Sequence, residues 1–284
     1  MERSSRSFKF LAAVLVMATW GCVPEPLPVD ELPKLEQKIV VASQIIPGQG
    51  LVVFLTRSLG ALDAGDGTDA QALLNQIVIN DALVTLQYTG GLDTLASLGN
   101  GLYGGLTINW QSSEVYELRV NSPEFGRVNA FARPLARVPF QTAEARLFVT
   151  EFDSLAEVSY SLQDPPGSNY YAVAFQEFSA NQQLGSLLNP DVFLHLNDDR
   201  AFDGQRFDDQ FRVFFRDFSA GDSVAVFLTN VQKEYYDYLK LRKDNRYTFA
   251  ELASEPLNYP TNVNGGLGFF NLHLPDVRIF VLDE

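Results

Sequence analysis

The chemistry that the sequence specifies best is acylation of a single thiol. Cys22 is the only cysteine among 284 residues, and it directly follows the small residue Gly21. Three basic residues and then nine consecutive apolar residues, Phe10 to Ala18, precede it. This order is typical of a secretory signal peptide, since the apolar run is too short to span a bilayer as a helix. We therefore predict a signal peptide over residues 1–21 and a lipid attached to Cys22.

The cleavage motif leaves one alternative open. Thr19 and Trp20 stand where a typical lipobox has Leu and a small residue, so the leader could be an ordinary signal peptide with an incidental cysteine. We favour lipid attachment because a leftover cysteine in a secreted chain calls for an explanation. Residues 22–36 contain four prolines among acidic residues, a composition that keeps a chain extended. This segment is predicted to be a tether between the membrane and a folded body.

Composition limits the partners of that body. The formal net charge is −14, and removal of the leader takes away Arg3, Arg6 and Lys9 but only one acidic residue, Glu2. Such a negative field argues against binding to nucleic acid and against adsorption on anionic lipid, so the membrane contact is expected through the lipid alone. One cysteine allows no disulfide within the chain, and no later apolar run is long enough for a transmembrane helix.

The elements that must position any site are expected to be mostly strands. We predict a mainly β fold of two β-sandwich-like domains, an N-terminal one over 37–138 that is immunoglobulin-like or transthyretin-like and a C-terminal one over 139–284. Helical spacing of apolar residues predicts short peripheral helices near 231–243 and, after a capping box at Thr68, over 68–78. The junction is expected near Pro134 and Pro139. The predicted strands are 38–46, 51–57, 83–88, 92–97, 102–109, 115–120, 127–133, 156–162, 170–178, 192–196, 206–218, 223–228 and 277–282.

Several segments of the second half occur in an order that resembles a known family. They are Asp164-Pro165-Pro166-Gly167, Phe202-Asp203-Gly204-Gln205, Gly221-Asp222-Ser223-Val224, Glu234-Tyr235-Tyr236-Asp237-Tyr238-Leu239 and Asn262-Val263-Asn264-Gly265-Gly266-Leu267-Gly268-Phe269-Phe270. Together they resemble the lipoprotein family catalogued as domain of unknown function 4249, over nearly the whole mature chain. The resemblance implies an outer-membrane lipoprotein of Gram-negative bacteria with a TonB-dependent receptor as a partner. It brings no catalytic residues.

Two acidic loops are candidate calcium sites, because calcium takes six to eight oxygen ligands. One contains Asp198, Asp199 and Asp203, and the other runs from Asp63 to Asp69. Neither has the spacing of the twelve-residue calcium loop. Carboxylates are also common in turns and in the first turn of a helix, where they need no metal. Whether these loops bind calcium stays open, and we assign no metal ligand.

The remaining motifs favour structural roles. His195 and His273 are the only histidines, and both alternate with apolar residues, so we expect outward-facing strand residues. Gly99–Gly104 matches a dinucleotide fingerprint, but a strand and not a helix is expected after it, which favours a glycine-rich hairpin. Asn264–Gly268 is expected to be a tight turn. With no nucleophile motif near either histidine, we predict no cofactor and no enzymatic activity.

Clustered tyrosines are the remaining candidates for recognition. They are Tyr170, Tyr171, Tyr235, Tyr236 and Tyr238. They could form an aromatic binding surface, but we expect them to pack, since one of two adjacent tyrosines usually faces the core. The sequence thus predicts a non-enzymatic binding or accessory lipoprotein of the outer membrane, with adhesive or structural lipoprotein and, less favoured, hydrolase as alternatives. It names no small-molecule ligand.

Overall fold

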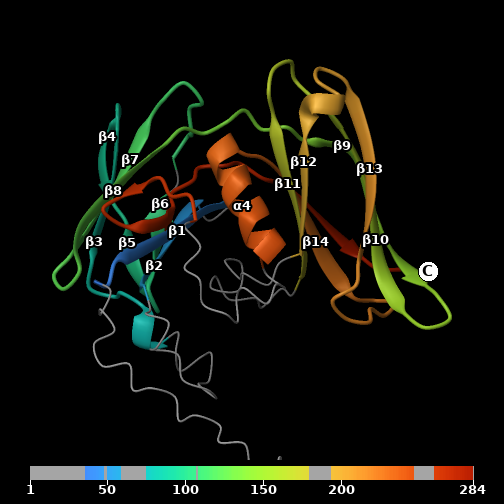
Figure 1. Ribbon diagram of the computed structural model, residues 1–284, viewed down its shortest axis with the longest axis horizontal. Helices are drawn as coiled ribbons and strands as arrows, with labels where there is room; N and C mark the ends of the chain where they lie inside the picture. The colour runs from blue at the N-terminus through green and yellow to red at the C-terminus, as the bar shows by residue number, and fades with distance from the viewer. Residues whose placement is uncertain are drawn as a thin grey trace, which may run out of the picture. The chain divides into compact units, whose positions relative to one another are not determined.

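The computed structural model describes residues 36–47, 50–58, 75–106, 108–178, 193–245 and 259–283. These belong to one compact unit, Glu36–Glu284 (Figure 1). The signal peptide, Cys22, the tether, the start of the helix expected over 68–78 and the acidic loop Asp63–Asp69 lie outside the described residues. No helix in the described ranges has the length and apolar character needed to cross a membrane.

Strands make up most of the described chain, in agreement with the mainly β prediction. The strands are β1 (Ile39–Ile46), β2 (Gly50–Arg57), β3 (Leu83–Tyr88), β4 (Gly91–Thr94), β5 (Ala96–Gly99), β6 (Leu102–Leu106), β7 (Tyr116–Ser122), β8 (Gly126–Ala132), β9 (Phe140–Val149), β10 (Ser154–Gln163), β11 (Tyr170–Glu177), β12 (Phe193–Asp198), β13 (Arg206–Val213), β14 (Ser223–Asn230), β15 (Val263–Asn264), β16 (Leu267–Phe269) and β17 (Asp276–Val281). The helices that have both ends in the described chain are the 3₁₀ turn η1 (Asp199–Ala201) and α4 (Lys233–Asn245). Residues 75–77, within the helix expected over 68–78, are also helical.

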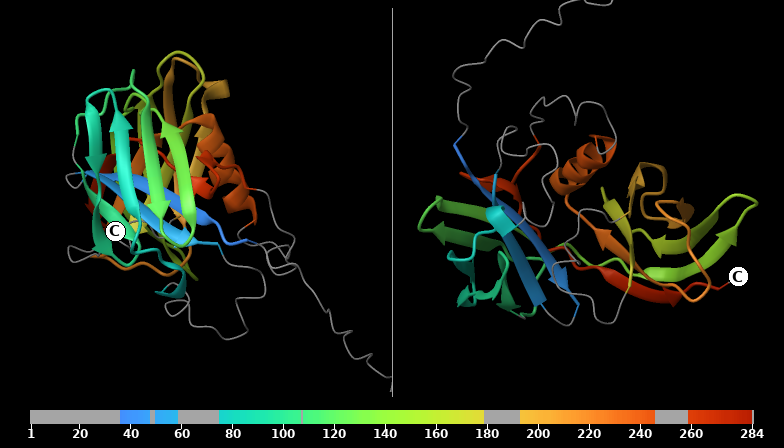
Figure 2. Two further views of the ribbon diagram at one scale, coloured as in Figure 1. Left: turned by 90° about the vertical axis from the view of Figure 1, so that its left-hand side faces the viewer. Right: turned by 90° about the horizontal axis from the view of Figure 1, so that it is seen from below.

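The first sandwich packs two five-stranded sheets around one apolar core. Their strand orders are β16-β1-β2-β6-β5 and β15-β8-β7-β3-β4, and strands of the second sheet lie side by side in the left panel of Figure 2. Side chains alternate along each strand, so in β7 Tyr116, Leu118 and Val120 point into the core while the residues between them are less buried. This alternation is what the sequence pattern predicted.

The second sandwich packs the sheet β13-β10-β9 against the sheet β12-β11-β14-β17. From β11, Tyr171, Val173 and Phe175 enter the core between them. The residues that alternate with these, Ala172, Ala174 and Gln176, point to the opposite face of the sheet. The described sheets thus confirm the prediction of two sandwich-like parts, and the outer face of β11 becomes available to carry a site.

One segment departs from the linear division at 138/139. β15 and β16 lie in sequence between β14 and β17 of the second sandwich but join the sheets of the first, where β16 pairs in parallel with β1. A Cβ on Gly268, at φ +87°, would lie 2.1 Å from the main-chain oxygen of Val41, so only glycine permits this approach. Phe270 and Leu272 then complete the first core. The range 139–284 is therefore not a single sandwich, and periodicity could not have shown it because it does not say which sheet a strand joins.

The helix α4 confirms the one expected near 231–243. Its Tyr236 and Leu239 are buried beside Ala172 on the outer face of β11, and Tyr235 and Tyr238 contact the ring of Phe269 in β16. Figure 1 shows the helix in orange next to β11. These contacts confirm the packing role predicted for the clustered tyrosines, and they make α4 a link between β16 of the first sandwich and β11 of the second.

Some predicted strands differ from the observed ones. The strand expected over 102–109 ends at Leu106, and the one over 206–218 ends at Val213. β9, directly after Pro139, was not predicted. It was missed because proline at a strand start looks like a junction in sequence, although a first strand position does not need the N–H that proline lacks.

Candidate functional site

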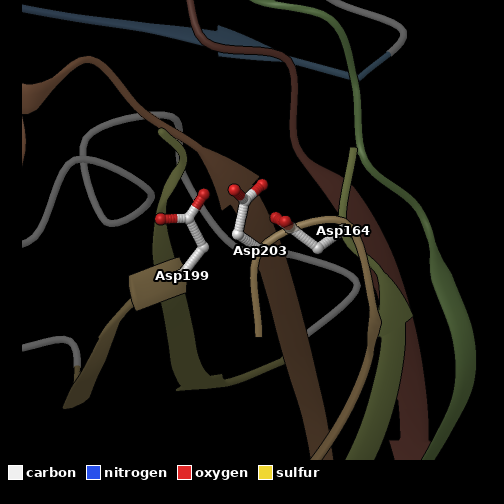
Figure 3. Close-up of side chains that lie close together, drawn as sticks. All are labelled: Asp164, Asp199 and Asp203. Carbon is white, nitrogen blue, oxygen red and sulfur yellow. The ribbon is translucent and has the colours of Figure 1, made fainter. Parts of the chain in front are cut away.

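The structure gathers three carboxylates, only two of which the sequence had grouped. Asp164, at the end of β10, joins Asp199 of η1 and Asp203 of the following turn, with one carboxylate oxygen from each within 4.8 Å of the others. Figure 3 shows the three side chains together; we call them the acidic corner. Asp198 does not belong to it, because its carboxylate binds the guanidinium of Arg200 with an Nε–Oδ1 distance of 2.7 Å.

The chain itself supplies donors to the acidic corner. Asp164 accepts hydrogen bonds from the Tyr171 hydroxyl and, at 2.8 Å, from the Gly204 N–H. Asp199 Oδ2 accepts from the Asn169 N–H at 2.6 Å, and Asp203 Oδ1 from the Gly167 N–H at 2.9 Å. Each carboxylate thus ties residues 164–171 to residues 199–204. Burial, and then the bond to Asp164, raise the pKa of Tyr171, so that hydroxyl stays protonated and keeps donating.

His195 does not face outward as expected. Its ring stacks on Phe211 at a centroid distance of 4.8 Å, on the core side of β12. Its Nε2 lies 2.7 Å from Asp209 Oδ2, which also accepts from Tyr160 and Asn197. Burial alone would raise the pKa of Asp209, but hydrogen bonds from His195, from the Gln210 N–H and from Tyr160, led by the one from His195, lower it. The histidine therefore closes a polar network at the sandwich edge, which explains its place without a ligand.

A pocket lies on the outer face of β11, between α4 and β1. Its cavity volume is about 190 Å³, and its lining is mainly apolar. Alanines at positions 42, 172 and 174 leave this space, since their side chains end at Cβ. We call it the α4 pocket. Its main contributors are Ala42 and Gln44 from β1, Ala172, Ala174 and Gln176 from β11, Phe227 and Thr229 from β14, Tyr235, Tyr238, Leu239 and Arg242 from α4, and Phe269, Asn271 and His273 from β16 and the segment after it.

His273 is the first polar wall of the α4 pocket, and its expected outward position is wrong. The residue is 4% exposed, and burial lowers its pKa to about 3, so the ring is neutral at pH 7. Its Nε2 accepts the Gln232 N–H at 3.2 Å. A neutral imidazole with an accepting Nε2 carries its proton on Nδ1. This Nδ1–H has no hydrogen-bond partner within the described structure.

Gln176, which also lines the α4 pocket, has a second unpartnered donor. The residue is 8% exposed, and its Nε2 amide group has no partner among the described residues. Asn230 has the other unpartnered buried atom, Oδ1, but it does not line the α4 pocket, and its Nδ2 donates to Asn169. Gln176 could not be found from the sequence, because a glutamine near the end of a strand belongs to no motif.

Arg242, in the last turn of α4, places a cation at the α4 pocket. It makes no hydrogen bond or ion pair with another described residue. Burial raises the pKa of the Tyr235 phenol to about 12, and the nearby positive charge of Arg242 lowers that pKa in part. The residues that line the pocket thus include two with buried, unpartnered N–H groups and one with a guanidinium.

The fold and site define a class of mainly β, two-sandwich proteins with a small pocket under a linking helix. Within it, the chain matches the family described as Domain of unknown function (DUF4249) over residues 25–274. The chain belongs to that family, as the ordered motifs predicted.

Comparison with curated proteins finds no match. Among solved structures, a segment of two fibronectin type-III domains from chicken tenascin is similar to 69% of this chain, over 91% of its own length. The two share 10% identity with a TM-score of 0.20, a likeness too low to carry a functional or detailed structural argument.

Proposed function

We propose that this protein is a non-enzymatic, lipid-anchored binding protein of the bacterial outer membrane, with the α4 pocket as its ligand site. The observation that carries the proposal is the pair of buried, unpartnered donors on Gln176 and His273. Buried polar groups are nearly always hydrogen-bonded, and leaving one unpaired costs about 1–3 kcal/mol. A bound molecule with an acceptor would remove that cost at each position that it reaches.

Binding fits the α4 pocket better than acid–base catalysis. A catalytic base works best with a pKa near the operating pH, whereas burial lowers the pKa of His273 to about 3. The lining is also mainly apolar with a few convergent polar groups, a common character of ligand sites.

The anchor rests on the sequence alone. The leader, Cys22 and the proline-containing tether support export and lipid attachment. With a lipid anchor, the acidic body does not have to bind the membrane surface itself. The family resemblance supports an outer-membrane location and a TonB-dependent receptor as the partner. The ligand would pass between the α4 pocket and that receptor.

The anchor is tested by Cys22→Ser followed by membrane fractionation. We expect the variant in the soluble fraction or as uncleaved precursor, and an unchanged outer-membrane fraction would contradict the anchor. Pull-down from detergent-solubilised outer membranes tests the receptor. If correctly localised protein recovers no TonB-dependent receptor, the proposed role as a receptor accessory is contradicted, but ligand binding is not.

Ligand binding is tested by affinity selection from an envelope metabolite extract, with bound small molecules detected by mass spectrometry. Ala174→Trp should fill the α4 pocket and abolish retention. Ala220→Trp, at an exposed turn residue, is the matched control and should retain what wild type retains. If wild type retains nothing beyond Ala174→Trp, the α4 pocket is not a ligand site.

A further inference from the structure

We infer that one end of the second sandwich is a docking surface for a partner protein that offers an apolar pocket rimmed by basic side chains. The surface consists of the exposed residues Val149, Phe152, Phe214 and Phe215, and we call it the aromatic end. It rests on the proposed function, in which this partner is the receptor, and it gives the surface by which the two proteins meet.

Two segments that are far apart in sequence form the aromatic end. The turn between β9 and β10 carries Phe152, and the chain directly after β13 carries Phe214 and Phe215. Because β10 pairs antiparallel with both β9 and β13, the turn and the end of β13 lie at the same end of this sheet. The Ser154 hydroxyl donates to the Phe218 carbonyl at 2.7 Å, and the Phe218 N–H donates to the Ser154 carbonyl at 2.8 Å. These two bonds hold the segments next to each other.

The most exposed ring of the aromatic end is not needed by the turn that carries it. Phe152 is 89% exposed, and Phe214 is 73% exposed. Thr150 holds the turn, since its Oγ1 accepts the N–H groups of Phe152 and Asp153 at 3.2 and 2.9 Å. Single exposed apolar residues are normal, whereas a group of them marks an interaction site. The four apolar side chains on these adjoining segments therefore indicate a contact surface.

The base of the aromatic end is ordered before any partner binds. The ring of Phe215 lies against those of Phe175 and Phe218, with centroid distances of 6.4 and 5.5 Å. The Phe214 ring is 6.3 Å from that of Phe193. Side chains that are already held in place lose little conformational entropy on binding, and aromatic side chains are enriched in protein interfaces.

The charges around the aromatic end favour a protein over a lipid surface. Three exposed carboxylates rim it, those of Glu151, Asp153 and Asp217. The neighbouring Arg216 forms its ion pairs with other carboxylates. These three acidic groups would repel anionic lipid headgroups, whereas they would attract a basic rim on a partner protein and speed the encounter. The partner that fits is therefore a protein with an apolar pocket and a basic rim.

Pull-down with tagged protein from detergent-solubilised outer membranes tests the docking surface, with the recovered receptor quantified by mass spectrometry. Phe152→Ser and Phe214→Ser should each lower receptor recovery about tenfold, because each removes an aromatic anchor from the contact. Phe131→Ser changes an exposed phenylalanine of β8 in the first sandwich and should leave recovery unchanged. All three variants should keep the outer-membrane location of wild type, which shows that they fold.

Glu151→Lys tests the acidic rim in the same pull-down. It should lower receptor recovery roughly threefold, whereas Glu124→Lys, in the exposed turn between β7 and β8, should leave it unchanged. Equal recovery by wild type, Phe152→Ser and Phe214→Ser would overturn the docking surface while the proposed function stands. If wild type recovers no receptor, the accessory role and the docking surface are both contradicted.

Flotation with lipid vesicles separates a protein partner from a membrane. Protein with Cys22→Ser and without residues 1–21 has no lipid of its own. It should not float with vesicles of phosphatidylethanolamine and phosphatidylglycerol. Flotation that Phe152→Ser abolishes would show that the aromatic end enters a lipid surface, and it would overturn the inference of a protein partner.

Discussion

Two sets of buried polar groups, those of the acidic corner and those of the residues lining the α4 pocket, differ in how far the chain satisfies them. In the acidic corner, Asp164 accepts hydrogen bonds from both Tyr171 and Gly204. In the α4 pocket, Gln176 and His273 hold buried N–H groups without a partner. Because unpaired buried groups cost stability, the first cluster is expected to stabilise the fold and the second to reduce its stability until a ligand binds. Three predictions test this difference.

The largest effect is expected in the acidic corner. Asp164→Ala leaves the Tyr171 hydroxyl and the Gly204 N–H without their acceptor, so the free energy of unfolding should fall by about 3 kcal/mol. Urea denaturation at pH 7 measures it. Asp203→Ala, at an exposed carboxylate, is the control and should cost under about 1 kcal/mol. Equal losses in both variants would contradict a stabilising role for the buried carboxylate.

The next effect is a pH dependence from the α4 pocket. Burial lowers the pKa of His273 to about 3 in the folded protein, against an ordinary value of 6.5. Between these pH values the unfolded chain binds a proton that the native state does not, so stability falls as the pH falls. At pH 5 the loss relative to pH 7 should be roughly 2 kcal/mol.

His273→Gln isolates this contribution because glutamine does not titrate. In ligand-free protein, the difference in unfolding free energy between wild type and His273→Gln should shift by roughly 2 kcal/mol from pH 7 to pH 5, in favour of the variant. Urea titrations at both pH values measure it. Parallel pH profiles of the two proteins would show that His273 is not held neutral by burial.

The smallest effect has the opposite sign to that in the acidic corner. Gln176→Leu removes a buried donor without a partner and keeps most of the side-chain volume, so it should raise the unfolding free energy by about 1 kcal/mol without ligand. Gln210→Leu, on the exposed side of β13, should change it by under about 0.5 kcal/mol. A loss of stability in Gln176→Leu would mean that the pocket is satisfied without a ligand, and the contrast between the clusters would disappear.

Much of the fold could be predicted from local patterns. The strand expected over 83–88 is β3, and the helix expected near 231–243 is α4. The hairpin expected at Gly99–Gly104 joins β5 to β6, with Asn100 and Gly101 at positive φ. These features depend on alternation, helical spacing and turn residues, which act over a few positions of the chain.

The candidate site was harder to predict, because its members are far apart in sequence. The sequence grouped Asp199 with Asp203 by proximity, but Asp164 reaches them only through the pairing of β10 and β11 with their neighbours. Gln176 and His273 were not grouped at all. Neither residue belongs to a motif, and what distinguishes them is burial without a partner.

The sequence by itself determined the strand content, the position of α4, the acidity of the body and the single thiol at Cys22, because each depends on composition or short-range spacing. Only the tertiary structure decided which polar groups are satisfied. Whether a polar group is satisfied depends on which atoms the fold brings together and removes from water. Asp164, for example, accepts a hydrogen bond from the Tyr171 hydroxyl, whereas Gln176 lines the α4 pocket.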